Sequence, residues 1–154
     1  MATITLAVLA GCAAPPQQPS SQVAPESLTT CKPGASEDML TGVWLSMRRQ
    51  PGVSGELKTF IELRPDGTMN YAEQLTRPKR APQGLAEKGC WYREGQTLVL
   101  RTLESNGSPV DPEDPIYMNR YEIKSEARER LQLTSPEGAR LDAKRMPPDY
   151  RLSW

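Results

Sequence analysis

The chain has 154 residues, which suffice for one domain and a short additional segment but not for two separate cores. Lys and Arg together number 19, as do Asp and Glu, so no overall charge directs the protein to nucleic acid. Histidine is absent, which removes the commonest general base and metal ligand and excludes a serine triad of the usual kind. We therefore expect no enzyme activity, no catalytic residues, no cofactor and no metal site.

The N-terminus has a short apolar run, Ile4–Ala10, followed by Gly11, Cys12 and a segment rich in Pro, Gln and Ser. The run is far shorter than the roughly 20 residues that a membrane-spanning helix requires. This order of residues is typical of a cleavable export signal.

The tetrapeptide Leu9-Ala10-Gly11-Cys12 resembles the lipobox of bacterial lipoproteins, in which the cysteine receives lipid and becomes the first residue after cleavage. The resemblance implies a signal peptide over residues 1–11, palmitate-type acylation at Cys12 and attachment to the cell envelope. Because Ala13 rather than Asp follows the cysteine, it also implies the outer membrane, facing the periplasm. Met1-Ala2-Thr3 lacks the basic residue that such signals carry, so we expect the true start to lie upstream. The alternative is a chance apolar N-terminus with a buried thiol.

If Cys12 carries lipid, Cys31 and Cys90 remain and can pair in an oxidising compartment. The loop closed would span about 60 residues and contribute on the order of 4 kcal/mol in the chain-entropy description. Two separate buried thiols are the alternative. A zinc site is disfavoured because two cysteines without histidine do not complete it.

Residues 12–36 contain few large apolar side chains and many Pro, Gln and Ser, a composition that indicates a disordered tether. Residues 37–146 change to a pattern of period two, which indicates strands. We expect a single helical turn at Glu37–Leu40, and a loop over Thr76–Leu85 because of its prolines and glycine. The strands are expected at about Val43–Arg48, Glu56–Leu63, Thr68–Leu75, Lys88–Arg93, Thr97–Leu103, Tyr117–Lys124, Arg130–Thr134 and Ala139–Met146.

About eight short strands in sequence, joined by turns such as Arg64-Pro65-Asp66-Gly67, must bury one face and protect two edges. Closing the sheet on itself achieves both, so the sequence predicts an all-β, up-and-down antiparallel barrel. A two-sheet β-sandwich is the alternative that the same alternation supports.

Gly42-Val43-Trp44 opens the first strand, and Arg145 lies near the end of the last one. This pair resembles the lipocalin signature, and with Gly89-Cys90-Trp91 the chain is similar to lipocalin-like domains of bacterial lipoproteins. The resemblance implies that Arg145 packs over Trp44 and closes one end of the barrel, a cation–π contact of about 0.5 to 2 kcal/mol. Otherwise Trp44 is an ordinary core residue and Arg145 faces solvent.

Two further segments have no assigned role. Arg77, Lys79 and Arg80 form a basic cluster that either contacts lipid headgroups or anionic cell-wall material or, more simply, is a solvated loop. The C-terminal tail, residues 147–154, carries Tyr150, Leu152 and Trp154, which are suited to plugging a barrel opening or meeting a partner.

The sequence thus favours a lipid-anchored, non-enzymatic envelope protein whose barrel binds a small apolar or amphipathic molecule. The alternative is an interaction or inhibitor module for another envelope protein, for example through the loop around Gly107–Pro115. The expected partners are the membrane, through the lipid anchor, and either such a ligand or such a protein, and no nucleic acid.

Overall fold

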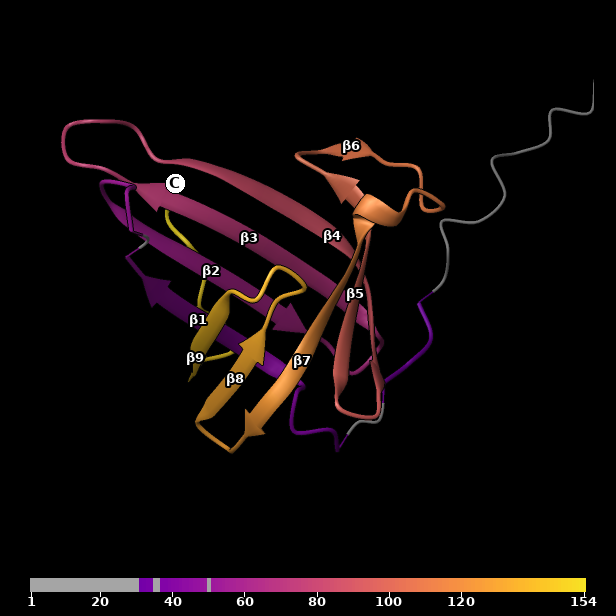
Figure 1. Cartoon of the computed structure of the whole chain (residues 1–154). Helices are drawn as coiled ribbons and strands as arrows, with labels where there is room; N and C mark the ends of the chain where they lie inside the picture. Colours follow the sequence, from indigo (N-terminus) through magenta and orange to yellow (C-terminus); the bar gives the residue numbers. More distant parts are fainter. Residues whose placement is uncertain (1–30, 35–36, 50) are drawn as a thin grey trace, which may run out of the picture.

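The computed structural model describes residues 31–34, 37–49 and 51–154. Nine strands and one short 3-10 helix occur in these ranges (Figure 1). The elements are β1 (Gly42–Arg48), β2 (Glu56–Leu63), β3 (Thr68–Thr76), β4 (Gln83–Glu94), β5 (Thr97–Ser105), β6 (Ser108–Pro109), η1 (Pro115–Tyr117), β7 (Met118–Glu126), β8 (Arg130–Thr134) and β9 (Arg140–Met146). No helix in the described ranges is long and apolar enough to span a bilayer.

The sheet closes on itself as an antiparallel barrel. Strands follow the order β4-β3-β2-β1-β9-β8-β7-β5, and β4 also pairs with β5, so the two ends of the series meet. The two-residue strand β6 pairs with the end of β5 and lies outside this ring. Eight strands therefore form an up-and-down barrel, which confirms the sequence prediction and excludes the two-sheet sandwich.

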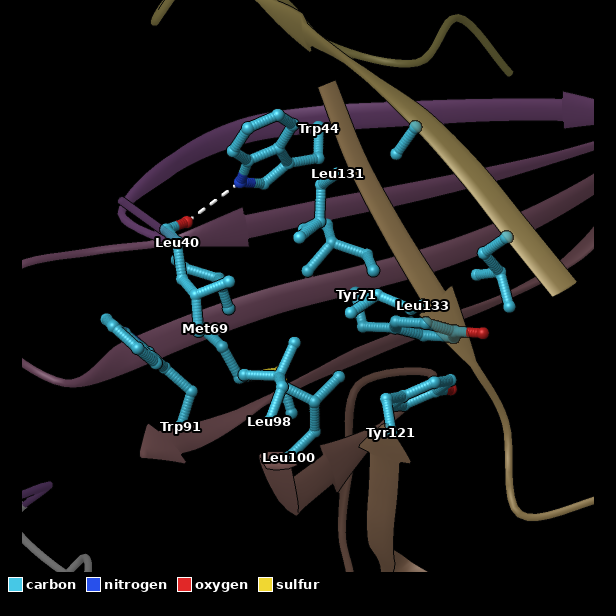
Figure 2. Close-up of a cluster of buried hydrophobic side chains, with 14 of the residues drawn as sticks. Leu40, Trp44, Met69, Tyr71, Trp91, Leu98, Leu100, Tyr121, Leu131 and Leu133 are labelled. Carbon is cyan, nitrogen blue, oxygen red and sulfur yellow. Dashed lines mark hydrogen bonds between the residues drawn. The ribbon is translucent and has the colours of Figure 1, made fainter. Parts of the chain in front are cut away.

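Alternate residues of the strands point inward and form one continuous apolar core (Figure 2). Its largest members, Trp44 and Trp91, are each 1% exposed. Both indole nitrogens have partners, since Trp44 Nε1 donates to the Leu40 carbonyl at 2.8 Å and Trp91 Nε1 donates to the Arg64 carbonyl at 2.8 Å. The core is thus packed, and the polar groups of its two tryptophans are satisfied.

The barrel has two unlike ends. We define the closed end as the one where β1 begins and β2 ends, which is also the end of the turn between β4 and β5. Leu40 covers it and is fully buried. The open end is the opposite one, where β1 ends at Arg48, β3 ends at Thr76 and β4 begins at Gln83.

Two sequence expectations were wrong in detail. β4 begins at Gln83, inside the segment expected to be a loop, because Gln83–Glu87 pairs with β3, beginning with Gln83 opposite Leu75. Residues Glu37–Leu40 form turns rather than a helical turn, with the Asp38 side chain accepting a hydrogen bond from Leu40 N at 2.9 Å. The first difference depends on pairing with β3, whereas the second follows from a local side-chain contact that favours a turn.

The C-terminal tail packs on the outside of the barrel instead of plugging an opening. Tyr150 stacks on Phe60 with ring centroids 6.3 Å apart, and Leu152 joins the same cluster with Val43 and Ala72. Further along, Gln74 Nε2 donates to the Ser153 carbonyl at 2.6 Å. The outward face of β2 and β3 is therefore buried, which alternation alone did not indicate.

Candidate functional site

The closed end brings together the two residues that the lipocalin resemblance singled out. The Arg145 guanidinium carbon lies 4.1 Å from the centroid of the Trp44 ring. Its Nη1 donates to the Thr41 carbonyl at 2.6 Å and its Nη2 to the Met39 carbonyl at 2.7 Å. Arg145 therefore holds the covering segment against the barrel as well as stacking on the indole.

This geometry also explains the glycine of the Gly-x-Trp motif. Gly42 has a φ of 138°, and a Cβ atom there would overlap Nη1 of Arg145. A larger residue would displace the guanidinium from the tryptophan. The Gly-x-Trp motif therefore serves packing at the closed end.

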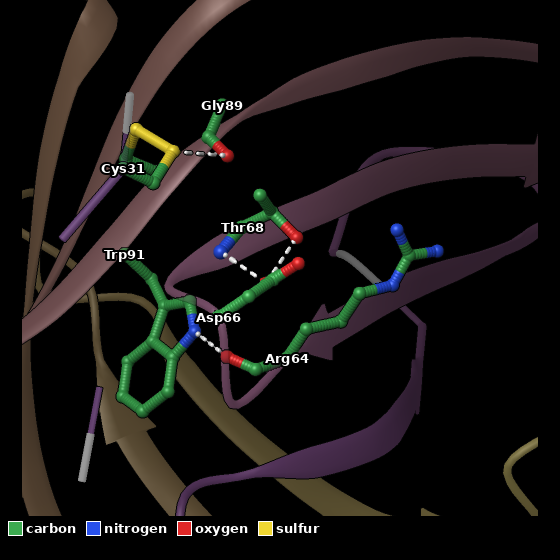
Figure 3. Close-up of a disulfide and its surroundings, with 7 residues drawn as sticks. Cys31, Arg64, Asp66, Thr68, Gly89 and Trp91 are labelled. Carbon is green, nitrogen blue, oxygen red and sulfur yellow. Dashed lines mark hydrogen bonds between the residues drawn. A yellow bond between two sulfur atoms is a disulfide. The ribbon is translucent and has the colours of Figure 1, made fainter. Parts of the chain in front are cut away.

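Cys31 and Cys90 form the predicted disulfide, with a Cα–Cα distance of 5.2 Å (Figure 3). The bond joins the segment before the barrel to β4, and Gly34 lies against the ring of Trp91. The described part of the segment that we expected to be a tether is therefore fixed to the closed end. Cys12, the expected lipidation site, and the signal peptide lie outside the described residues.

The open end has a different interior, lined by polar side chains as well as apolar ones. Glu73 Oε1 accepts hydrogen bonds from Tyr71 Oη at 2.8 Å and from Thr59 Oγ1 at 3.4 Å. The buried phenol of Tyr121 lies beside that of Tyr71 (Figure 2). Burial raises the pKa of both tyrosines, and the charge of Glu73 raises it further, so the phenols stay neutral hydrogen-bonding groups.

A second carboxylate, Glu87, enters the same region from β4. Its Oε2 accepts a hydrogen bond from Thr102 Oγ1 at 3.1 Å. Burial raises the pKa of Glu87, the bond from Thr102 opposes that change, and the negative charge of Glu73 adds to it. Neither Glu73 nor Glu87 forms a salt bridge with another described residue.

These side chains line two adjoining cavities at the open end. They measure about 330 Å³ and about 240 Å³ and are open to solvent. Both are bordered by Leu85, so they adjoin at that side chain. The first is lined by Tyr71, Leu85, Glu87, Ser105, Ile116, Tyr117, Asn119 and Tyr121. The second is lined by Leu57, Glu73, Leu75, Gln83, Gly84 and Leu85. An outer groove of about 390 Å³ lies beside Leu152 and Trp154 of the tail, and Tyr71 and Glu87 also border it.

The arrangement suits a molecule with a polar and an apolar part. It offers carboxylate and phenol groups for a polar head and leucine side chains for an apolar body. Within the described ranges, no three Cys, Asp or Glu side chains gather in a way that would hold a metal ion. We regard the open end as the candidate ligand site.

Sequence reasoning did not single out the residues of this site. Glu73 is in phase with Tyr71 on β3, and Glu87 is in phase with Leu85 on β4, so strict alternation would have placed them inside. The usual assumption that carboxylates face solvent concealed this signal. Glu87 was further concealed because this strand was expected to begin only at Lys88.

No family model and no curated protein matches the sequence. Among solved structures, the crystal structure of the Cpx pathway activator NlpE from Escherichia coli is similar, with a TM-score of 0.43 and 19% sequence identity. The match covers 75% of this chain and 50% of the other, so the chain spans about half the length of that protein. Similarity at this level carries no argument about function, and the barrel assignment rests on the strand pairing described above.

Proposed function

We propose that the protein is a lipid-anchored envelope lipoprotein whose lipocalin-like barrel binds a small amphipathic molecule at its open end, without catalysis. The observation that carries the binding role is the pair of adjoining cavities around Leu85. The larger of these two lies within the range of roughly 300 to 1,000 Å³ that is usual for ligand pockets. The anchor is supported by the Leu9-Ala10-Gly11-Cys12 motif.

The side chains around the cavities favour a molecule with two unlike parts. Leu57, Leu75 and Leu85 offer apolar surface, whereas Glu73 and Glu87 beside them accept hydrogen bonds. Because two half-buried carboxylates lack a basic partner, a head group that donates hydrogen bonds fits better than an anionic one. A purely apolar ligand would leave these carboxylates desolvated and unpaired.

Binding is tested with long-chain alkyl amines and fatty acids of equal length, which compete for a fluorescent naphthylamine probe. We expect the amine to displace the probe more strongly than the acid. Leu85→Trp fills the junction of the cavities and should reduce probe affinity at least tenfold. Ala86→Trp adds a similar side chain on the outward face of the same strand and serves as the matched control. Equal affinity of both variants for the probe would refute binding inside the barrel.

The anchor is tested separately in cells that produce the wild type or Cys12→Ser, labelled with a palmitate analogue. We expect label and membrane association in the wild type and neither in the variant. Label that persists in Cys12→Ser would refute the assignment of the anchor but would leave the ligand site untouched.

A protein-interaction role is the second candidate, and one observation favours it. The segment from Asn106 to Tyr117 projects beside the open end (Figure 1), and Ile116 on it is 72% exposed. Cross-linking in envelope preparations tests this role. We expect Ile116→Asp to abolish any specific adduct, with Ile116→Val as the control that retains an apolar side chain. Adducts of equal yield in both variants would contradict a role for this segment.

A further inference from the structure

Basic side chains gather at the open end on two neighbouring loops. Arg48 ends β1 and Arg49 follows it, whereas Arg77, Lys79 and Arg80 follow β3. We call these five residues the basic rim. The two loops touch, because Gly55 lies against the Thr76 carbonyl and the Arg77 side chain.

The basic rim lacks acidic partners within the described part of the chain. The salt bridges there use other basic residues, among them Arg64, Arg93 and Arg120, and none uses a residue of the rim. Glu56 begins β2 beside the rim, yet it forms no salt bridge with a described residue either. Ion pairing is thus concentrated elsewhere on the barrel, and the rim keeps its positive charge.

The β3–β4 loop presents its cations on a tight turn. Arg80 N donates to the Arg77 carbonyl at 3.4 Å, and Lys79 has a φ of 57°, a conformation uncommon for a residue other than glycine. Lys79 and Arg80 are exposed. The turn therefore directs positive charge away from the barrel.

Exposed apolar side chains accompany the cations. Trp154 is 61% exposed and its ring lies against Gly84, at the start of β4. Met47 and Val53, on the β1 side of the rim, are 54% and 37% exposed. Cations beside an exposed tryptophan and aliphatic side chains are the combination that suits the interfacial region of a lipid bilayer.

We propose that the basic rim and Trp154 form a docking surface for the anionic headgroups of a membrane. The cations contact the headgroups, and Trp154 and Val53 enter the interfacial layer. Charge complementarity selects an anionic surface, and the apolar side chains select lipid over a soluble polyanion. The docking surface lies beside the barrel cavities but shares no lining residue with them, and it does not depend on the proposed acyl anchor.

The test uses the full-length chain with Cys12→Ser, so that acylation plays no part, and vesicles with about one-third anionic lipid. We expect the protein to sediment with them and to be released as salt rises from about 0.1 M to about 0.5 M. Purely zwitterionic vesicles report any apolar binding by the uncleaved N-terminus. Equal binding to both kinds of vesicle would overturn the proposal.

Charge reversal locates the surface. Arg77→Glu/Lys79→Glu/Arg80→Glu should lower vesicle partitioning about a hundredfold or more, given roughly fivefold for each cation near a membrane. Arg128→Glu/Arg130→Glu/Lys144→Glu makes the same change in net charge at the closed end and should alter it less than threefold. Equal losses in the two triple variants would show an effect of net charge alone and would overturn the proposal.

A single substitution gives a smaller effect. Lys79→Gly suits the local backbone and should by itself lower vesicle partitioning about fivefold.

Tryptophan fluorescence gives an independent readout. Trp44 and Trp91 are each 1% exposed, so a change on adding vesicles reports on Trp154. We expect a blue shift with anionic vesicles that Trp154→Phe abolishes. A shift that persists in Trp154→Phe, or binding to a soluble anionic polysaccharide without binding to vesicles, would contradict a lipid-docking surface.

Discussion

The two ends of the barrel are built from the same strands but differ in what fills them. At the closed end, Trp44 is buried, its indole nitrogen is bonded and Arg145 covers its ring. At the open end, Glu73 and Glu87 occupy inward positions beside cavities. One end is thus filled with apolar side chains, and the other retains polar groups that cost stability.

The difference indicates that packing and the proposed ligand binding use opposite ends of the barrel. β4 shows this most clearly, because it carries Trp91 and Cys90 near one end and Leu85 and Glu87 near the other. The residues of the proposed ligand site can therefore vary without loss of the packed core. The predictions below test this separation, beginning with the largest expected effect.

Replacement of Trp44 by Ala should lower the free energy of unfolding by about 3 to 5 kcal/mol, because a large cavity would remain in the packed core. Leu85→Ala at the open end should cost only about 1 kcal/mol, since this side chain already borders a cavity. Urea unfolding of both variants provides the measurement. Similar costs would show that the ends are packed alike.

Removal of the disulfide by Cys31→Ser/Cys90→Ser should cost about 2 to 4 kcal/mol, because a link between residues 59 positions apart restricts the unfolded chain. Thermal unfolding of the protein with and without reductant is the measurement. Because the bond lies at the closed end, probe affinity at the open end should remain unchanged under conditions where the variant is folded. A loss of affinity in the folded variant would contradict the separation.

Arg145→Lys should cost about 1 to 2 kcal/mol. Lysine keeps the charge but cannot stack as a plane on Trp44 or reach the carbonyls of Thr41 and Met39 together. The melting temperature reports the change, and Arg130→Lys, at an exposed position, is the control. An unchanged midpoint would assign Arg145 no role in closing the barrel.

Glu87→Gln should have the smallest effect, and its sign should depend on pH. Burial raises the pKa of Glu87 in the folded state, so the wild type loses stability as pH rises from the ordinary glutamate value through the raised one. The variant has no carboxyl group at this position and therefore does not lose stability in this way. Its stability relative to the wild type should therefore be greater at about pH 7 than at about pH 4 in urea unfolding.

Glu62 provides a comparison of opposite sign. Burial acts to raise its pKa, but hydrogen bonds from Asn70 and Arg64 outweigh that effect, and the net pKa is lowered. Its stabilisation is present above the ordinary glutamate pKa and is lost as pH falls through the folded value. Glu62→Gln should thus lose stability at about pH 7 and little at low pH. The same sign for both variants would contradict the assigned environments.

Local patterns predicted the barrel because alternation and turns such as Pro65-Asp66-Gly67 act over short distances. The Gly-x-Trp motif and Arg145 also predicted the contact that closes one end. The start of β4 at Gln83 and the tail over Phe60 were missed, since both depend on partners distant in sequence. The inward carboxylates were missed because burial of a charge is set by the assembled cavity.

The central claim is that the open end binds an amphipathic molecule while the closed end serves packing. An NMR titration of the full-length chain with a long-chain alkyl amine tests it most directly. We predict shifts concentrated at Leu85, Glu87, Tyr117 and Asn119, with little change at Trp44 and Leu98. Shifts confined to the outer groove beside Leu152, or no shifts at saturating ligand, would contradict the claim.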